Sequence, residues 1–173
     1  MFELCLRIKN WHREVGEDLH IGVLALQGDY AEHINMLQSN NADVSEIRLP
    51  SQLDDVDGLI IPGGESTTIV QLIDIYDFRT KLVEKASQGF PIWGTCAGMI
   101  VMARELTDHR PEPLNLMNIK VSRNAFGRQI DSFEEDLTIK GIEGKFPAVF
   151  IRAPIVVEND SSVDILCSID KPS

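Results

Sequence analysis

Three short apolar runs, each followed by a turn and then by a helical pattern, constrain the fold more than any other feature of this sequence. The runs cover residues 21–26, 58–61 and 91–93. Continuous apolar runs of this length are typical of strands that are covered on both faces. Helices are predicted after them over 29–40, from Ser66 onwards and over 97–106. Strands that alternate with helices predict a three-layer α/β fold, an open and mainly parallel sheet with helices on both faces.

The remaining elements are weaker signals. Ser66 is predicted to cap its helix, residues 74–77 to interrupt it, and Gly89 to end the continuation over 78–87. Five further strands complete the prediction, at 44–49, 118–123, 137–139, 149–152 and 163–169. Because no long helix separates the last four, they predict a small antiparallel extension of the sheet.

The chain length of 173 residues suits one compact domain. Residues 1–20 are polar and without a clear period, so they are predicted to be an N-terminal extension that is disordered or lies on the surface. Residues 21–173 are predicted to form the domain. No stretch approaches the roughly 20 apolar residues of a membrane span.

Charge and cysteine content exclude several classes of function. The formal net charge of −11 argues against binding to nucleic acid or to an anionic membrane, since both require a basic surface. The three cysteines, Cys5, Cys96 and Cys167, are too few and too widely spaced for a disulfide framework, which favours a reducing cytoplasm. No cysteine pair or histidine cluster suggests zinc, and we predict no metal and no cofactor.

Cys96 lies in the segment Gly94-Thr95-Cys96-Ala97-Gly98, where the third apolar run meets its helix. This is the pattern of a nucleophile elbow with cysteine in place of serine, in which small neighbours relieve the crowding of a sharp strand-to-helix turn. A helix N-terminus favours the thiolate, and the Ala97 N–H is placed to stabilise an oxyanion. The alternative is a small buried cysteine, which is the preferred reading for Cys5 and Cys167.

A second loop at a strand end reads PGGESTT over residues 62–68. Gly63 and Gly64 allow the backbone to approach a ligand closely, and exposed N–H groups there can bind a carboxylate or an oxyanion. The alternative is a turn followed by a helix cap. Two arginines beside small or apolar residues, Arg123 and Arg152, are candidates for binding a carboxylate with two hydrogen bonds, or for surface ion pairs.

These segments together resemble one family. GVLALQG at 22–28, PGGESTT at 62–68, GTCAG at 94–98, RNAFGRQ at 123–129 and FIRAP at 150–154 are similar to the glutaminase subunits of pyridoxal 5′-phosphate synthase. These subunits are class I, triad-type glutamine amidotransferases with a flavodoxin-like fold. The resemblance covers residues 21–173, and the motif set is specific to this subunit, whereas GTCAG alone indicates only the wider amidotransferase group.

The resemblance implies a reaction and a set of site residues. Cys96 would attack the side-chain amide of L-glutamine to form a thioester, with Gly63, Gly64 and Ala97 as the oxyanion hole. Gly64, Glu65, Ser66, Arg123, Ile151 and Arg152 would bind the substrate. The ammonia would pass to a separate synthase subunit that makes the vitamin B6 cofactor, so the family implies an obligate protein partner.

The sequence departs from the family pattern in two places. Residues 1–20 have no counterpart. The His-x-Glu pair of the triad belongs to a C-terminal segment like F-H-P-E, and the sequence ends before it, at Ser173. The leaving amine needs a proton and the thioester needs an activated water, so the nucleophile alone is half a triad. We expect the C-terminal segment to be missing from this sequence.

Two other hypotheses stay open. The chain is a catalytically inactive, glutaminase-like binding subunit if the absent histidine has no substitute. It is a different elbow-cysteine hydrolase if its activity does not depend on Arg123 or Arg152. Rapid alkylation of Cys96 by a glutamine-like diazo ketone would argue against the binding subunit.

Overall fold

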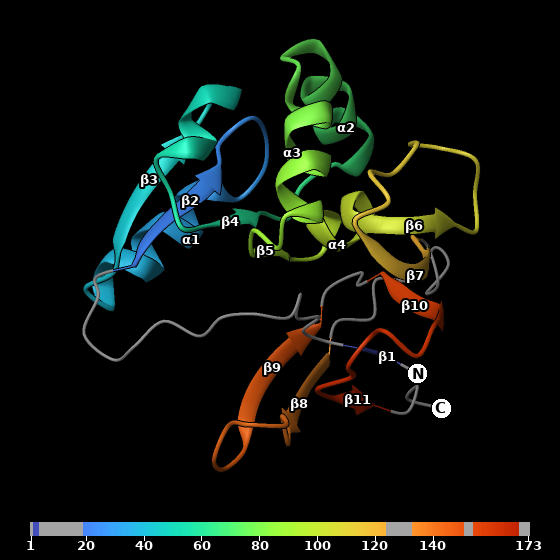
Figure 1. The fold of residues 1–173 in the computed structure, drawn as a ribbon. Helices are drawn as coiled ribbons and strands as arrows, with labels where there is room; N and C mark the ends of the chain where they lie inside the picture. The colour runs from blue at the N-terminus through green and yellow to red at the C-terminus, as the bar shows by residue number, and fades with distance from the viewer. Residues whose placement is uncertain (1, 4–18, 124–132, 151–153, 170–173) are drawn as a thin grey trace.

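The computed structural model describes residues 2–3, 19–123, 133–150 and 154–169. In its first part, strands and helices alternate as predicted (Figure 1). The strands are β2 (His20–Leu24), β3 (Asp43–Ile47), β4 (Gly58–Ile61) and β5 (Ile92–Gly94), and the helices are α1 (Tyr30–Ser39), α2 (Ser66–Ile75), α3 (Phe78–Ser87) and α4 (Ala97–Met102), with a 3₁₀ turn η1 (Pro50–Asp54).

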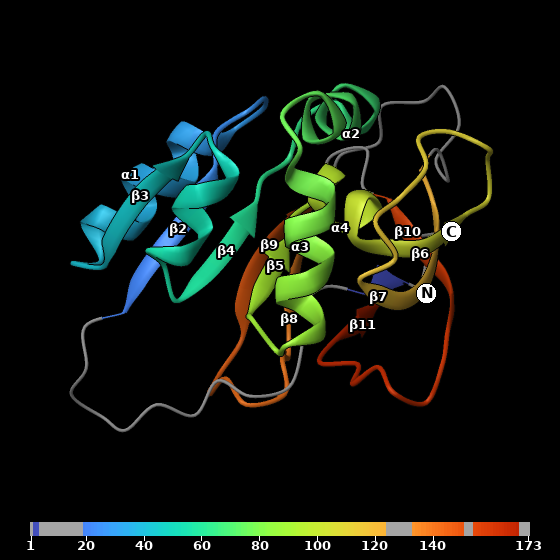
Figure 2. The same ribbon diagram turned by 45° about the horizontal axis from the view of Figure 1, so that its top comes forward.

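The four strands form a parallel sheet in the order β3-β2-β4-β5. One face buries Ile21, Val23 and Ile60 under apolar side chains of α1. The other face packs Leu59 and Ile61 into the main core with α2, α3 and α4. Figures 1 and 2 show α1 and the pair α2 and α3 on opposite sides of the sheet. The prediction of a three-layer, mainly parallel α/β fold is confirmed.

The second part of the chain adds β6 (Ala103–Leu106), β7 (Met117–Ser122), β8 (Phe133–Leu137), β9 (Phe146–Phe150) and β10 (Ile155–Asn159). β7 pairs in parallel with β6 and antiparallel with β10, and β8 and β9 form an antiparallel hairpin. At the chain ends, β1 (Phe2–Glu3) pairs antiparallel with β11 (Ser168–Ile169). The predicted antiparallel extension is therefore present, although one of its strand pairs is parallel.

Several predicted elements were wrong in extent. The helix expected over 97–106 ends at Met102, because residues 103–106 leave the helix to pair with β7. The strand expected over 137–139 lies earlier, at Phe133–Leu137, and that expected over 163–169 is reduced to Ser168–Ile169. β10 was not predicted. Of the strand expected over 149–152, residues 151 and 152 lie outside the described part.

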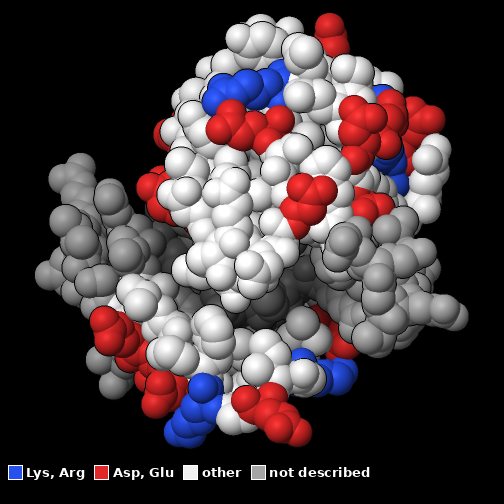
Figure 3. All heavy atoms as spheres, turned by 90° about the vertical axis from the view of Figure 1, so that its left-hand side faces the viewer, with Lys and Arg blue, Asp and Glu red and all other residues white. Residues whose placement is uncertain are grey.

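The surface agrees with the acidic composition. Figure 3 shows separate groups of acidic side chains on the side that faces its viewer, and the described residues there form no broad basic area. Among the described residues, no helix is both long enough and apolar enough to cross a membrane.

Candidate active site

The turn at Cys96 is a strained elbow between β5 and α4. Cys96 has φ 49° and ψ −107°, a combination that residues other than glycine rarely adopt, and its side chain is exposed. Backbone hydrogen bonds hold both sides of the turn: the Thr95 N–H donates to the Ile61 carbonyl at 3.0 Å, and the Gly98 N–H donates to the Thr95 carbonyl at 2.8 Å. The thiol therefore projects from the carboxyl end of the parallel sheet.

The two glycines of the elbow are required by close backbone packing. A Cβ on Gly98 would overlap the Ile61 carbonyl oxygen on β4. A Cβ on Gly94 would lie 2.5 Å from the carbonyl carbon of Gly98. The strand, the turn and the first residues of the helix thus approach each other more closely than any side chain permits. α4 has only six residues, fewer than predicted. Fewer peptide dipoles therefore add up to favour the Cys96 thiolate than in the longer helix that was expected.

The diglycine loop lies beside the nucleophile. A Cβ built on Gly63 would be 3.5 Å from the Cys96 Cβ, which places the loop within van der Waals reach of the elbow. Gly64 has φ 153°, within the region that favours glycine. The structure therefore brings together Cys96, Ala97, Gly63 and Gly64 at one edge of the sheet.

The segment from Gln27 to Asp29, which follows β2, holds the diglycine loop in place. The Asp29 N–H donates to the Gly63 carbonyl at 3.0 Å, and the Glu65 N–H donates to the Gln27 Oε1 at 2.9 Å. Gly28, with φ 95°, packs so tightly that a Cβ there would overlap the Gly63 carbonyl oxygen. Because a trans peptide points its C=O and N–H in opposite directions, the Gly64 N–H points away from this segment.

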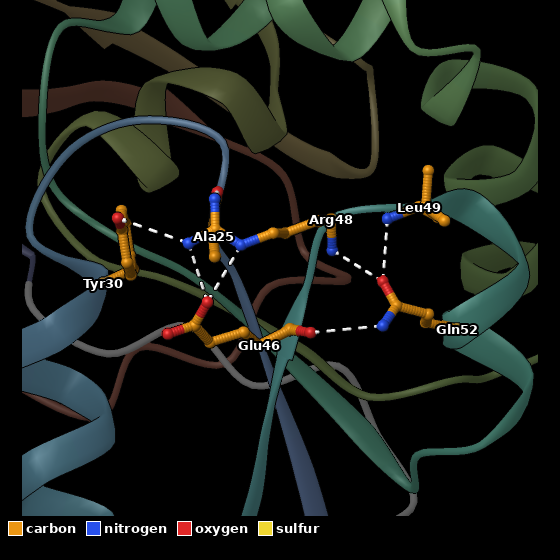
Figure 4. A network of polar contacts seen from close by, with 6 residues as sticks. All are labelled: Ala25, Tyr30, Glu46, Arg48, Leu49 and Gln52. Atoms are coloured by element: carbon orange, nitrogen blue, oxygen red, sulfur yellow. Dashed lines mark hydrogen bonds and ion pairs between the residues drawn. The ribbon is translucent and has the colours of Figure 1, made fainter.

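An arginine network anchors Ala25, just before this segment (Figure 4). Arg48, just beyond β3, donates to the Ala25 carbonyl at 3.1 Å and pairs with Glu46 at 2.7 Å. Its guanidinium also lies 5.3 Å from the centre of the Tyr30 ring, at the start of α1. The hydrogen bonds that Arg48 donates to Tyr30 and Glu46 raise the Arg48 pKa. The contacts tie the end of β2 to β3 and α1.

Glu65, and not Ser66, caps α2. The Glu65 carboxylate accepts hydrogen bonds from the N–H groups of Thr67 at 3.1 Å and Thr68 at 2.6 Å, and from the Thr68 hydroxyl at 2.8 Å. Burial raises the pKa of this carboxyl, but the hydrogen bonds from Thr68 and Thr67 outweigh it and the pKa is lowered. Ser66 is instead the first helical residue and is buried. The predicted cap was wrong by one residue, since both side chains can accept these bonds.

Arg123, at the end of β7, approaches the same corner. One guanidinium nitrogen lies 3.7 Å from the Glu65 Oε1, and another lies 3.7 Å from the Asp108 Oδ2. The guanidinium also donates to the Arg110 carbonyl. A cation that reaches from the extension to the α2 cap is suited to a carboxylate ligand. Ile151 and Arg152, also predicted to bind substrate, lie outside the described residues.

A histidine that sequence reasoning missed reaches the elbow from the other face. His33 on α1 places its Nε2 3.0 Å from the Thr95 Oγ1, and its ring meets Trp93 edge-on with centroids 6.3 Å apart. Burial lowers the His33 pKa, against the opposing charges of Asp29 and Glu32. The contact forms only when the folded chain brings His33 beside Trp93 and Thr95, so no local motif could reveal it.

The donor set does not point to a metal. The residues that the structure describes contain no group of three or more His, Cys, Asp or Glu side chains able to hold an ion. What gathers here is an exposed thiol, a loop rich in backbone N–H groups, and a carboxylate–guanidinium pair.

A family model for SNO glutamine amidotransferases matches residues 23–171. The chain belongs to this family. It is 47% identical over 155 residues to pyridoxal 5'-phosphate synthase subunit PdxT of Thermosipho africanus, covering 89% of this chain and 82% of that protein. It is 52% identical over 149 residues to the subunit of the same name from Bacillus velezensis, covering 86% of this chain and 76% of the relative.

Solved structures share the fold of this chain. A crystal structure of a glutamine amidotransferase superposes with a TM-score of 0.81 at 40% identity, covering 86% of this chain and 79% of that one. PurLQS from Thermotoga maritima matches with a TM-score of 0.63 at 15% identity, covering 84% of this chain and 72% of that one, which shows a shared fold only.

Proposed function

We propose that this chain is the glutaminase subunit of a pyridoxal 5′-phosphate synthase, hydrolysing L-glutamine to glutamate and ammonia. The observation that carries the proposal is the juxtaposition of the exposed Cys96, on its strained elbow, with the Gly63–Gly64 loop, in a chain of the SNO amidotransferase family. The named relatives are synthase subunits at about half identity.

The reaction has two steps. The Cys96 thiolate attacks the side-chain amide carbon of glutamine, a C–S bond forms, and the C–N bond breaks as ammonia leaves with an added proton. Water then adds to the thioester, the C–S bond breaks, and glutamate leaves while the thiolate is regenerated. The sum is glutamine plus water to glutamate plus ammonia. A general acid–base must move the protons, and the family resemblance gives this task to a histidine in an F-H-P-E-like segment.

Backbone N–H groups would stabilise the negative oxygen of each tetrahedral intermediate. Ala97 is the first residue of α4, so its N–H has no acceptor within the helix. The Gly63 carbonyl is held by the Asp29 N–H, which leaves the Gly64 N–H directed away from residues 27–29. Gly63, Gly64 and Ala97 are therefore the proposed oxyanion hole, and such a donor typically contributes about 3 kcal/mol to the transition state.

The charged pair at the α2 cap would recognise the amino-acid end of the substrate. Arg123 is suited to the α-carboxylate and Glu65 to the α-ammonium, and their separation of 3.7 Å is short enough for one zwitterion to bridge both. Ser66, Ile151 and Arg152 remain proposed substrate-binding residues from the resemblance. Ammonia would pass to the synthase subunit, the proposed partner, and the proposed location is the cytoplasm.

The test is a glutaminase assay on the full-length protein mixed with its synthase subunit. We expect glutamate release that the Cys96→Ala variant lacks, with a covalent adduct at Cys96 when a diazo-ketone analogue of glutamine is added. Equal glutamate release by both proteins would refute the assigned nucleophile. If neither releases glutamate and Cys96 resists the analogue, the chain is the inactive binding subunit instead.

A further inference from the structure

Helix α1 contacts both halves of the proposed site. Asp29, immediately before the helix, donates its N–H to the Gly63 carbonyl at 3.0 Å. One turn later, His33 reaches the Thr95 hydroxyl at 3.0 Å. No residue of α1 is fully buried, so the helix contributes little to the main core. The contacts of Asp29 and His33 nevertheless fall on the diglycine loop and on the residue that precedes the nucleophile.

Thr95 is held at three atoms. Its N–H donates to Ile61 on β4, its carbonyl accepts from Gly98 on α4, and its hydroxyl meets His33 on α1. The first two bonds belong to the backbone of the turn itself. Of these three contacts, the His33 bond is the one that comes from the opposite face of the sheet.

The neighbouring backbone makes this third bond important. Cys96 occupies φ 49° and ψ −107°, a strained conformation that persists only when the surroundings hold it. Rotation at Thr95 is the nearest route by which the turn can relax. A hydrogen bond to its side chain opposes that rotation and keeps the thiol in its exposed position.

The environment of His33 suits such a role. The ring is half-buried and packs edge-on against Trp93, which fixes its plane. Asp29, just before α1, and Glu32 on α1 are the charged groups that act on it, and burial outweighs them to favour the neutral ring. A neutral imidazole can either donate to or accept from a threonine hydroxyl.

We propose that His33 is a positioning residue for Cys96, acting through the Thr95 hydroxyl to hold the elbow in its strained conformation. This inference rests on the proposed function, because it concerns the nucleophile of that reaction. It assigns His33 no proton transfer, which separates it from the acid–base histidine that the family resemblance places elsewhere.

The variants His33→Leu, His33→Gln and Thr95→Val test the proposal. Leucine removes the hydrogen bond, glutamine retains an amide near the position of Nε2, and valine removes only the Thr95 hydroxyl. The readouts are kcat and KM for glutamate release with the synthase subunit, and the rate of Cys96 alkylation by the diazo-ketone analogue. His20→Leu is the matched control, because the His20 Nε2 makes a similar 2.8 Å contact with the Ser45 hydroxyl at the far end of the sheet.

We expect His33→Leu and Thr95→Val each to lower kcat and the alkylation rate by about three- to tenfold, the range of one hydrogen bond, with KM nearly unchanged. The double variant should lose no more than either single one, because both remove the same contact. His33→Gln should recover most of the rate, and His20→Leu should match wild type.

Three results would overturn the proposal. The first is a wild-type rate in His33→Leu while Cys96→Ala is inactive. The second is a His33→Gln variant as slow as His33→Leu, which would make His33 an acid–base group. The third is additive losses in the double variant. If His33→Leu fails to fold, the comparison of Thr95→Val with Thr95→Ser replaces it, since only serine keeps the hydroxyl. Equal rates of glutamate release in these two variants would then overturn the proposal. Failure of the proposed function is distinct, because then Cys96→Ala keeps wild-type glutamate release, or neither protein releases glutamate and Cys96 resists the analogue.

Discussion

The two ends of the parallel sheet contain the same kind of polar contact in different settings. At the amino end, the His20 Nε2 forms a hydrogen bond with the Ser45 hydroxyl at 2.8 Å, and the His20 backbone N–H donates to the Asp57 carboxylate at 3.0 Å. These bonds join β2 to its neighbours in the sheet, with which it is already paired. At the carboxyl end, His33 bonds to Thr95 at 3.0 Å and links a helix to a strained turn. The first contact reinforces strands of the sheet, whereas the second adds a side-chain hydrogen bond from α1 to a turn that β4 and α4 already hold through their backbone.

Glycine packing differs in the same way. In the middle of β2, a Cβ on Gly22 would meet the Ile47 side chain, with Cγ1 at 2.7 Å. At the carboxyl end, a Cβ on Gly28 or Gly98 would overlap a backbone carbonyl oxygen. Side chains can rotate to make room, but backbone that is already hydrogen-bonded cannot. Ligands of open α/β sheets bind at the carboxyl ends of strands, where this molecule packs backbone on backbone.

Alanine substitutions at these glycines give the largest expected effect. We expect Gly98→Ala to abolish glutaminase activity and to lower the free energy of unfolding by about 3 kcal/mol, because the new methyl group overlaps the Ile61 carbonyl. Gly22→Ala should cost about 1 kcal/mol and keep its activity, since Ile47 can adjust. Urea unfolding and glutamate release measure both. Equal losses of activity in the two variants would contradict the distinction between packing against backbone and packing against a side chain.

A smaller effect is expected at Cys96, whose backbone angles are ones that residues other than glycine rarely adopt. Cys96→Gly should be inactive but more stable than wild type by about 1 kcal/mol, because relief of strain exceeds the added entropy of the unfolded chain. Asn41, before β3 at the amino end, also has positive φ, at 58°. Asparagine tolerates that region, so Asn41→Gly should change stability by only a few tenths of a kcal/mol. A destabilised Cys96→Gly would show that the elbow stores no strain.

The sequence predicted the carboxyl-end framework because its signals are local. Continuous apolar runs identify β2, β4 and β5, and a cysteine between small residues at a strand end identifies the elbow. The residues that hold this framework were not predictable in the same way. Gln27 and Asp29 read as a mere break in the pattern, and they acquire a role only when folding places β2 beside β4.

Two errors have physical causes of the same kind. Residues 103–106 have good helix propensity, yet they pair with β7, so tertiary pairing overrides a weak local preference. Glu65 and Ser66 are adjacent acceptors, and Gln27 binds the Glu65 N–H and so fixes Glu65 at the cap. β10 is different, because three consecutive β-branched residues at 155–157 were a usable signal that our predictions missed.

The smallest expected effect is on the pH dependence of the free energy of unfolding. It distinguishes the contribution of the buried His33 ring from that of its hydrogen bond to Thr95. The folded-state pKa of His33 lies below the ordinary value of 6.5, chiefly through burial, so the unfolded chain binds more protons between the two values. Stability from the neutral ring is therefore complete above 6.5 and is lost as pH falls toward the folded pKa. Between about pH 7.5 and about pH 5.5, wild type should lose more stability than His33→Gln, which carries no titrating ring. Thr95→Val keeps the buried ring, so its free energy of unfolding should depend on pH as steeply as that of wild type. Urea unfolding of the three proteins at each pH measures this. If the free energies of wild type and His33→Gln changed equally with pH, the His33 pKa would be the same in the folded and unfolded chains, which would contradict the prediction.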